Sequence, residues 1–117
     1  MAIRRLERMG RAGEALVAGL TGGRLTARQA PFDVVDFSTS VAYEVKTVSH
    51  LALLGTNKIH IEAGAWARKE AFLAEWGLRG VLMVVVIFSE DHTEVFRTEL
   101  KAHQRISSVV RLANRTS

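Results

Sequence analysis

Three carboxylates and a lysine lie within one short apolar stretch of the sequence, Pro31–Thr47. Asp33, Asp36, Glu44 and Lys46 stand there among valine, phenylalanine and tyrosine residues, which are typical of β-strands. Converging carboxylates bind hard cations such as Mg²⁺, and a neighbouring lysine can position a water molecule or offset the charge of a phosphate. The stretch therefore contains the residue types of a hydrolytic metal site, provided that the fold brings them to one side.

The spacing predicts that a β-hairpin does so. If Ser38-Thr39 forms the turn between two strands, Asp33 faces Glu44 across the hairpin. Side chains alternate between the two faces of a strand, so Glu44 and Lys46 share a face with Asp33, and Asp36 lies on the other. Facing carboxylates repel each other, which favours a bound cation over a purely structural role. A β-bulge or a shifted turn would exchange Asp36 for Asp33.

Hydrophobic periodicity predicts the elements that must hold this hairpin. We expect, in order, a helix over 3–21, strands over 24–29, 32–37 and 40–47, a helix over 62–76, strands over 81–88 and 93–98, and a terminal helix whose apolar face contains His103, Ile106, Val109, Val110 and Ala113. Residues 48–61 are ambiguous, with 58–61 a candidate extended segment. The order αβββαββα predicts one mixed α/β domain over residues 1–117, with helices packed on a central sheet.

Pro31-Phe32-Asp33, followed by Glu44-Val45-Lys46, resembles the signature of the PD-(D/E)XK nuclease superfamily, with Phe32 standing between the Pro and the Asp. That superfamily includes type II restriction enzymes and archaeal Holliday junction resolvases. The resemblance covers roughly residues 3–88 and implies a restriction-endonuclease-like αβββαβ core, with a mixed central sheet flanked by helices. It also implies Mg²⁺-dependent hydrolysis of DNA phosphodiester bonds, with Mn²⁺ as a substitute metal.

The same resemblance implies roles for individual residues. Asp33 and Glu44 would be metal ligands, with the carbonyl of Val45 as a further ligand, and Lys46 would position the nucleophilic water. Many members of the superfamily also carry a glutamate on the first helix near the metal, and Glu14 is the matching residue in this sequence. The predicted catalytic set is therefore Glu14, Asp33, Glu44 and Lys46.

Candidate substrate contacts lie outside the hairpin. Lys69 points from the apolar face of the second predicted helix, so it either extends along the surface to an edge or contacts a substrate phosphate. Lys58, beside His60, and Arg11, in the basic N-terminal segment, are further candidates for phosphate contacts. The non-catalytic alternative for Glu14 is a solvent-exposed residue beside Arg11.

Charge is unevenly distributed along the chain. Residues 1–30 carry six Arg against two Glu, residues 97–117 carry five Lys or Arg against one Glu, and the stretch between carries five against nine. Basic ends around an acidic middle suit a polyanion held around a metal site, although an ordinary solubilising surface has the same composition. The chain has no Cys, which excludes disulfides and thiolate metal sites and leaves a reducing cytoplasm as the expected compartment. Its longest apolar run, Val81–Phe88, is far shorter than the roughly 20 residues that span a bilayer, so no membrane partner is expected.

The sequence thus predicts a small, single-domain, Mg²⁺-dependent endonuclease that cleaves DNA with structural or low specificity, in the manner of a junction resolvase or an enzyme that processes phage or mobile-element DNA. A chain of 117 residues offers little recognition surface beyond a catalytic core, so we expect a homodimer. The alternatives are a non-catalytic nucleic-acid-binding or assembly protein that retains the fold, and a nuclease that acts on RNA.

Overall fold

A mixed six-stranded sheet forms the centre of the protein, with strands in the order β1-β2-β3-β5-β6-β8. The computed structural model describes residues 2–27, 29–54, 58–112 and 114–115. Its elements, in chain order, are α1 (Ala2–Thr21), β1 (Arg24–Leu25), β2 (Val34–Asp36), β3 (Val41–Ser49), the 3₁₀ helix η1 (His50–Leu54), β4 (Lys58–His60), α2 (Ala63–Trp76), β5 (Arg79–Ser89), β6 (His92–Glu99), β7 (His103–Arg105), α3 (Ile106–Leu112) and β8 (Asn114–Arg115). The predicted α/β class, with helices on a mixed sheet, is confirmed.

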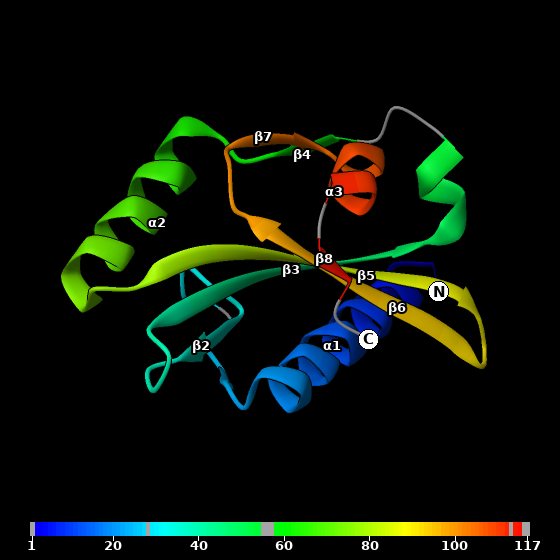
Figure 1. Cartoon of the computed structure of the whole chain (residues 1–117), viewed down its shortest axis with the longest axis horizontal. Helices are drawn as coiled ribbons and strands as arrows, with labels where there is room; N and C mark the ends of the chain where they lie inside the picture. The colour runs from blue at the N-terminus through cyan, green and yellow to red at the C-terminus, as the bar shows by residue number, and fades with distance from the viewer. Residues whose placement is uncertain (1, 28, 55–57, 113, 116–117) are drawn as a thin grey trace.

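The sheet separates two apolar layers. Helix α1 covers one face, where Val17 packs with inward-facing residues of β2, β3, β5 and β6. Helices α2, η1 and α3 and a two-stranded ribbon made of β4 and β7 lie over the other face (Figure 1). No helix in the described ranges is long and apolar enough to cross a membrane.

Strand β5 is the central element of the sheet. It pairs in parallel with β3 and antiparallel with β6, and Val81 to Val86 are all buried. Alternate residues of this run enter the two apolar layers, with Val81, Met83 and Val85 on the α1 side and Leu82, Val84 and Val86 on the other. A continuous apolar run is what a strand covered on both faces requires, so the prediction for this strand is confirmed.

The predicted hairpin register is confirmed as well. Val34 pairs with Tyr43 and Asp36 pairs with Val41, which is the predicted alignment. Asp33 lies just before the paired residues, and its N–H donates to the carbonyl of Tyr43. The turn is longer than the two-residue turn expected from Ser38-Thr39, because it occupies residues 37–40 and places Ser40 in a left-handed conformation with φ of 59°. The extra turn residues come equally from both strands, so the register is unchanged.

Two glycines end the helices. Gly22, after α1, has φ of 77° and donates its N–H to the carbonyl of Ala18, and Gly77, after α2, has φ of 65° and donates to Leu73. A left-handed residue after the last turn satisfies a carbonyl that the helix leaves unpaired, and glycine adopts it without a steric cost. Both stops agree with the sequence prediction.

The predicted terminal helix is partly wrong. His103 lies in β7 and not on a helix, because residues 103–105 pair with β4, and the helix begins at Ile106. Val109 is buried on α3 as expected, and Ala113 lies outside the described residues. The ambiguous segment 48–61 contains the end of β3, η1 and β4, so the extended segment expected over 58–61 is confirmed for 58–60.

Candidate active site at the start of strand β2

Asp33 immediately precedes β2, where the chain bends before it enters the sheet. Its N–H donates to the carbonyl of Tyr43 at 3.0 Å, and its carbonyl accepts from the N–H of Thr26 at 3.1 Å. The Thr26 hydroxyl also donates to the carbonyls of Phe32 and Asp33. These hydrogen bonds hold the backbone of Asp33 between the neighbouring chain segments and so fix the position from which its side chain extends.

The carboxyl groups of Asp33 and Glu44, called the acidic pair below, meet on the strand pair as the register requires. Asp33 Oδ2 accepts the N–H of Val45 at 2.9 Å, and the carboxyl group of Glu44 lies close enough to Asp33 to shift its pKa. Burial first, and then the hydrogen bond and charge of Glu44, raise the pKa of Asp33 to about 7, although the Val45 N–H acts in the opposite direction. Two close carboxylates cannot both ionise without cost, so the pair holds a proton or attracts a cation near neutral pH.

Lys69 supplies a positive charge from within the protein. Its Nζ lies 2.7 Å from Oε2 of Glu44, it donates a hydrogen bond to the carbonyl of Pro31, and it sits over the ring of Phe32 at 4.5 Å from the centroid. Only 8% of Lys69 is exposed, so it does not extend to the surface as one sequence interpretation supposed. This lysine therefore holds one carboxylate oxygen of Glu44 beside Asp33.

Helix α1 brings Glu14 to the same place because Gly13 allows a very close approach to β3. A Cβ atom at Gly13 would lie 1.8 Å from Oγ1 of Thr47, which no side chain could tolerate without a shift. Glu14, the next residue, is half-buried, and burial followed by the charge of Glu44 raises its pKa, whereas Arg11 and Lys46 act to lower it. Glu14 therefore lies within electrostatic reach of both Glu44 and Lys46, and it is also close to Arg11.

A pocket of about 310 Å³ opens beside these groups. Asp33, Glu14 and Arg11 line it together with Leu25, Thr26 and Ala27. Lys46 is exposed, and it shares the face of β3 with Glu44 because the two residues are two apart. Glu14 and Asp33 of the predicted catalytic set thus line this pocket, and Glu44 and Lys46 lie within electrostatic reach of Glu14.

Asp36 serves a different purpose. Its carboxylate accepts hydrogen bonds from the backbone N–H and the hydroxyl of Ser38 and from the hydroxyl of Thr39. These hydrogen bonds, with the Ser38 hydroxyl first, lower the pKa of Asp36. The side chain is committed to closing the hairpin turn, so the structure gives no support to an exchange of Asp36 for Asp33.

The donor set determines which cation would fit. Asp33 and Glu44 present carboxylate oxygens, the kind of ligand that Mg²⁺ prefers. In an extended strand the N–H and C=O of one residue point to the same side, so the Val45 carbonyl lies on the side where its N–H meets Asp33. Among the described residues, no three Asp, Glu or His side chains are grouped so that they could hold a metal. The residues therefore fit a cation that keeps several of its own waters, as Mg²⁺ usually does.

Two contributors to the site were not recognised in the sequence, namely the Lys69–Glu44 ion pair and the Thr26 brace behind Asp33. Lys69 carried a signal, because a lysine on an apolar helix face must find a partner or an exit. Lys58, predicted to contact substrate, lies on β4 and is absent from the pocket beside Asp33. No family model, curated protein or solved structure matches the chain.

Proposed function

We propose that the protein is a Mg²⁺-dependent endonuclease of restriction-endonuclease-like fold that hydrolyses DNA phosphodiester bonds. The observation that supports this most strongly is the acidic pair, in which burial and the neighbouring Glu44 carboxyl group raise the pKa of Asp33 to about 7 beside an exposed lysine. The element order α1-β1-β2-β3, followed by α2 and β5, also fits the implied αβββαβ core, with η1 and β4 inserted before α2.

In this proposal Asp33 and Glu44 hold the cation, with the Val45 carbonyl as a further ligand. When bound, Mg²⁺ supplies Lewis-acid stabilisation of charge on the phosphate. Lys46 orients the attacking water and offsets charge on the phosphate, which its exposed position on the face of Glu44 allows. Glu14 accepts a hydrogen bond from a water in the pocket that it lines with Asp33.

Lys69 is a positioning residue in this proposal and not a substrate contact. Its ammonium group is already bound to Glu44 and to the carbonyl of Pro31, and the side chains of Lys69 and Glu44 are 10% and 12% exposed. A buried ion pair holds its partners in one geometry more firmly than a solvated pair does. Lys69 therefore keeps Glu44 turned toward Asp33, and Arg11, exposed at the rim of the pocket, is the better candidate for a phosphate contact.

Cleavage assays with Mg²⁺ or Mn²⁺ test the proposal on branched DNA, linear duplex DNA and single-stranded RNA. Wild-type protein should cleave DNA, and Lys46→Ala should reduce the rate by roughly 10²- to 10⁴-fold, the range of a positioned acid–base group. Because Lys46 is exposed, the variant should retain the unfolding midpoint of wild type. If neither protein cleaves any of the substrates and both bind DNA equally, the chain is a non-catalytic nucleic-acid-binding protein. Cleavage of RNA alone would keep the chemistry and change the substrate.

A further inference from the structure

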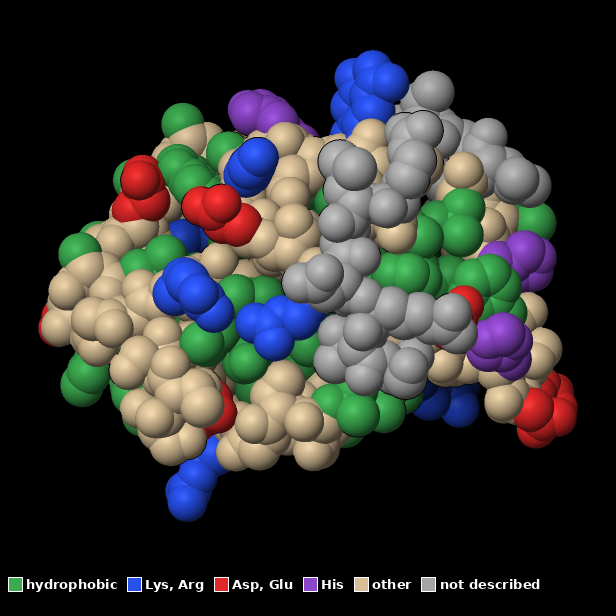
Figure 2. All heavy atoms as spheres, in the orientation of Figure 1, with side chains coloured by type: hydrophobic (Ala, Val, Ile, Leu, Met, Phe, Trp, Pro, Cys, Tyr) green, Lys and Arg blue, Asp and Glu red, His purple; other side chains and the backbone are tan. Residues whose placement is uncertain are grey.

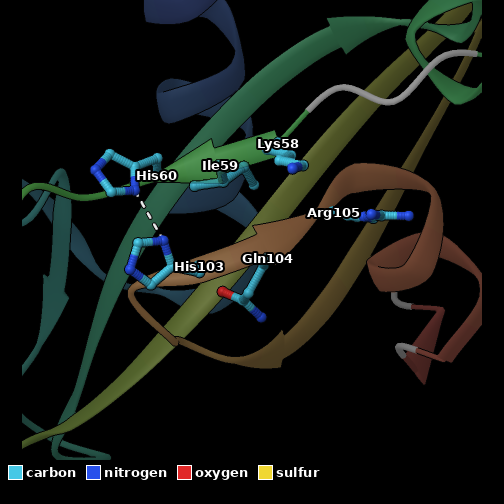
Figure 3. Close-up of a pocket in the computed structure, with 6 residues that line it drawn as sticks. All are labelled: Lys58, Ile59, His60, His103, Gln104 and Arg105. Atoms are coloured by element: carbon cyan, nitrogen blue, oxygen red, sulfur yellow. Dashed lines mark hydrogen bonds between the residues drawn. The ribbon is translucent and has the colours of Figure 1, made fainter.

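The β4–β7 ribbon carries four basic side chains on one face. Lys58 pairs with Arg105 and His60 pairs with His103 in its antiparallel register. Residues two apart on a strand project to the same side, so all four side chains share the outer face of the ribbon, and all four are exposed. This set of four residues is called the basic ribbon below. Figure 3 shows the histidine pair and the Lys58–Arg105 pair along the ribbon, with Ile59 and Gln104 between them.

The opposite face of the ribbon anchors it to the protein. Ile59 is 4% exposed and packs in the same apolar layer as Leu82 and Val84 of β5. The N–H of Ile61 donates to the carbonyl of Ala102 at 2.9 Å, which closes the end of the ribbon. An isolated two-stranded hairpin is marginally stable in water, so these contacts are what hold the four basic residues in place.

A bound anion would supply the negative charge that the basic ribbon lacks. Like charges directly opposite each other destabilise an antiparallel strand pair, and Lys58 stands opposite Arg105. Nδ1 of His60 lies 2.8 Å from Nδ1 of His103, so one of the two nitrogens donates an N–H hydrogen bond and the other accepts it. Among the described residues, no carboxylate forms an ion pair with any of the four side chains. The ribbon therefore lacks counter-charge of its own.

A metal ion is a poorer occupant than an anion. Two imidazole nitrogens could coordinate a transition metal, but Lys58 and Arg105 lie on the next rung and would repel a cation. Elsewhere on the face shown in Figure 2, Lys and Arg side chains are spread over the surface with Asp and Glu among them. On the ribbon, by contrast, four basic side chains are grouped on one face.

We infer that the basic ribbon binds the sugar-phosphate backbone of a nucleic acid strand, with one phosphate at each rung. The rungs lie two residues apart, roughly 6.6 Å along the strand, which is comparable to the spacing of neighbouring phosphates on one nucleic acid strand. The four side chains border a pocket of about 450 Å³, together with Ile59 and Gln104. Arginine, lysine and histidine donate hydrogen bonds to phosphate oxygens without reading the base sequence. The inference rests on the proposed function, because it locates part of the substrate of that site.

The ribbon lies on the same side of the sheet as two of the proposed catalytic residues. Glu44 and Lys46 project from the face of β3 that also carries Ala42, and Ala42 packs in the apolar layer beneath the ribbon. Helix α2 begins directly after β4 and carries Lys69 to Glu44. A nucleic acid strand held at the ribbon is therefore on the correct side of the sheet to reach Lys46.

Binding of a fluorescein-labelled duplex DNA, measured by anisotropy in EDTA, tests the ribbon separately from catalysis. Lys58→Gln/Arg105→Gln should weaken binding roughly tenfold at about 0.1 M salt and reduce the slope of log K against log salt by about 1. The matched control Arg68→Gln/Arg79→Gln removes the same charge from exposed positions outside the ribbon and should have a smaller effect. Lys58→Arg/Arg105→Lys, which keeps the charge, should bind as wild type does.

The inference is overturned if the ribbon variant binds DNA as tightly as wild type, or if the control pair loses as much affinity as the ribbon pair. It is also overturned if only binding to phosphatidylserine vesicles, and not to DNA, is lost in the ribbon variant. Circular dichroism confirms that each variant is folded before its affinity is compared. Failure of the nuclease proposal would give a different result, in which DNA binds through the ribbon but is not cleaved when Mg²⁺ is added.

Discussion

The acidic pair and the basic ribbon both bring side chains of like charge together, but they differ in burial and in the counter-charge that each has. In both, side chains of like charge lie close together, Asp33 beside Glu44 at the start of β2 and Lys58 opposite Arg105 on β4–β7. The acidic pair is largely buried and has an internal counter-charge, Lys69, at 2.7 Å from Glu44. The basic ribbon is exposed, and water screens the repulsion between its charges.

Because of this difference, the two regions suit ligands of opposite charge. Within the protein, Lys69 forms its ion pair with Glu44, and the pKa of Asp33 rises to about 7 as a result of burial and of the neighbouring Glu44. At the surface, the missing negative charge costs little until a polyanion arrives. A cation suits the first region and a phosphate backbone suits the second, and a nuclease needs both.

Removal of the internal counter-charge should produce the largest change in stability. Lys69→Ala leaves Glu44 buried beside Asp33 without a partner, so the free energy of unfolding should fall by about 3 kcal/mol. Urea unfolding followed by tryptophan fluorescence measures the change. Lys58→Ala on the ribbon is the matched control, because it removes an exposed lysine opposite a like charge and should change stability by less than about 0.5 kcal/mol. Equal effects of the two variants would break the distinction between the regions.

A substitution at Gly13 tests the close contact between α1 and β3 that brings Glu14 near the acidic pair. Gly13→Ala forces a Cβ against Thr47 and should destabilise the protein by about 1–3 kcal/mol while moving Glu14 away from Glu44. Gly19→Ala on the same helix meets no atom within 4 Å and should stabilise the protein by up to about 1 kcal/mol. Thermal unfolding of the two variants measures the contrast. If Gly13→Ala is as stable as Gly19→Ala, the close contact between α1 and β3 does not exist.

The dependence of stability on pH should show a smaller effect, and only for the acidic region. The pKa of Asp33 is raised in the folded protein from the ordinary 3.8 to about 7, so the folded state holds a proton that the unfolded state releases between these values. The free energy of unfolding should therefore fall as pH rises from about 4 to about 7, and the raised pKa of Glu14 adds to the fall.

Asp33→Asn should reduce this slope and make the metal-free protein more stable than wild type near pH 8. The ribbon variant Lys58→Gln/Arg105→Gln should retain the wild-type slope, since it leaves Asp33 and Glu14 unchanged. Urea unfolding at a series of pH values measures both. A wild-type stability that rises between about pH 4 and about pH 7 would contradict the assignment. The lowered pKa of Asp36 acts only below its ordinary value of 3.8, outside this window.

Local sequence was enough to predict the hairpin register, because strand alternation and the Ser38-Thr39 turn position constrain each other. It was also enough for β5, whose unbroken apolar run requires cover on both faces. The terminal helix was predicted too long because His103 stands three residues before Ile106, a helical spacing. The pairing of His103 with His60, 43 residues earlier, overrides that local pattern.

In the candidate site, relations within one hairpin were predictable from the sequence, but contacts between distant elements were not. Asp33, Glu44 and Lys46 are close in sequence and on one hairpin, so their relation follows from strand geometry alone. The ion pair of Lys69 with Glu44 depends on how α2 packs on β3, and the basic ribbon joins two three-residue strands far apart in the chain. Neither contact has a local pattern that specifies its partner.

Calorimetric titration of Mn²⁺ into the metal-free protein near pH 8 tests whether the acidic pair is a divalent-cation site. Wild-type protein should bind a single Mn²⁺ per chain, because Asp33 is ionised above its pKa of about 7 and stands beside the carboxyl group of Glu44. Asp33→Asn, which keeps the shape and removes the charge, should lose this binding. Equal Mn²⁺ affinity in wild type and Asp33→Asn, or no binding by wild type, would contradict the account.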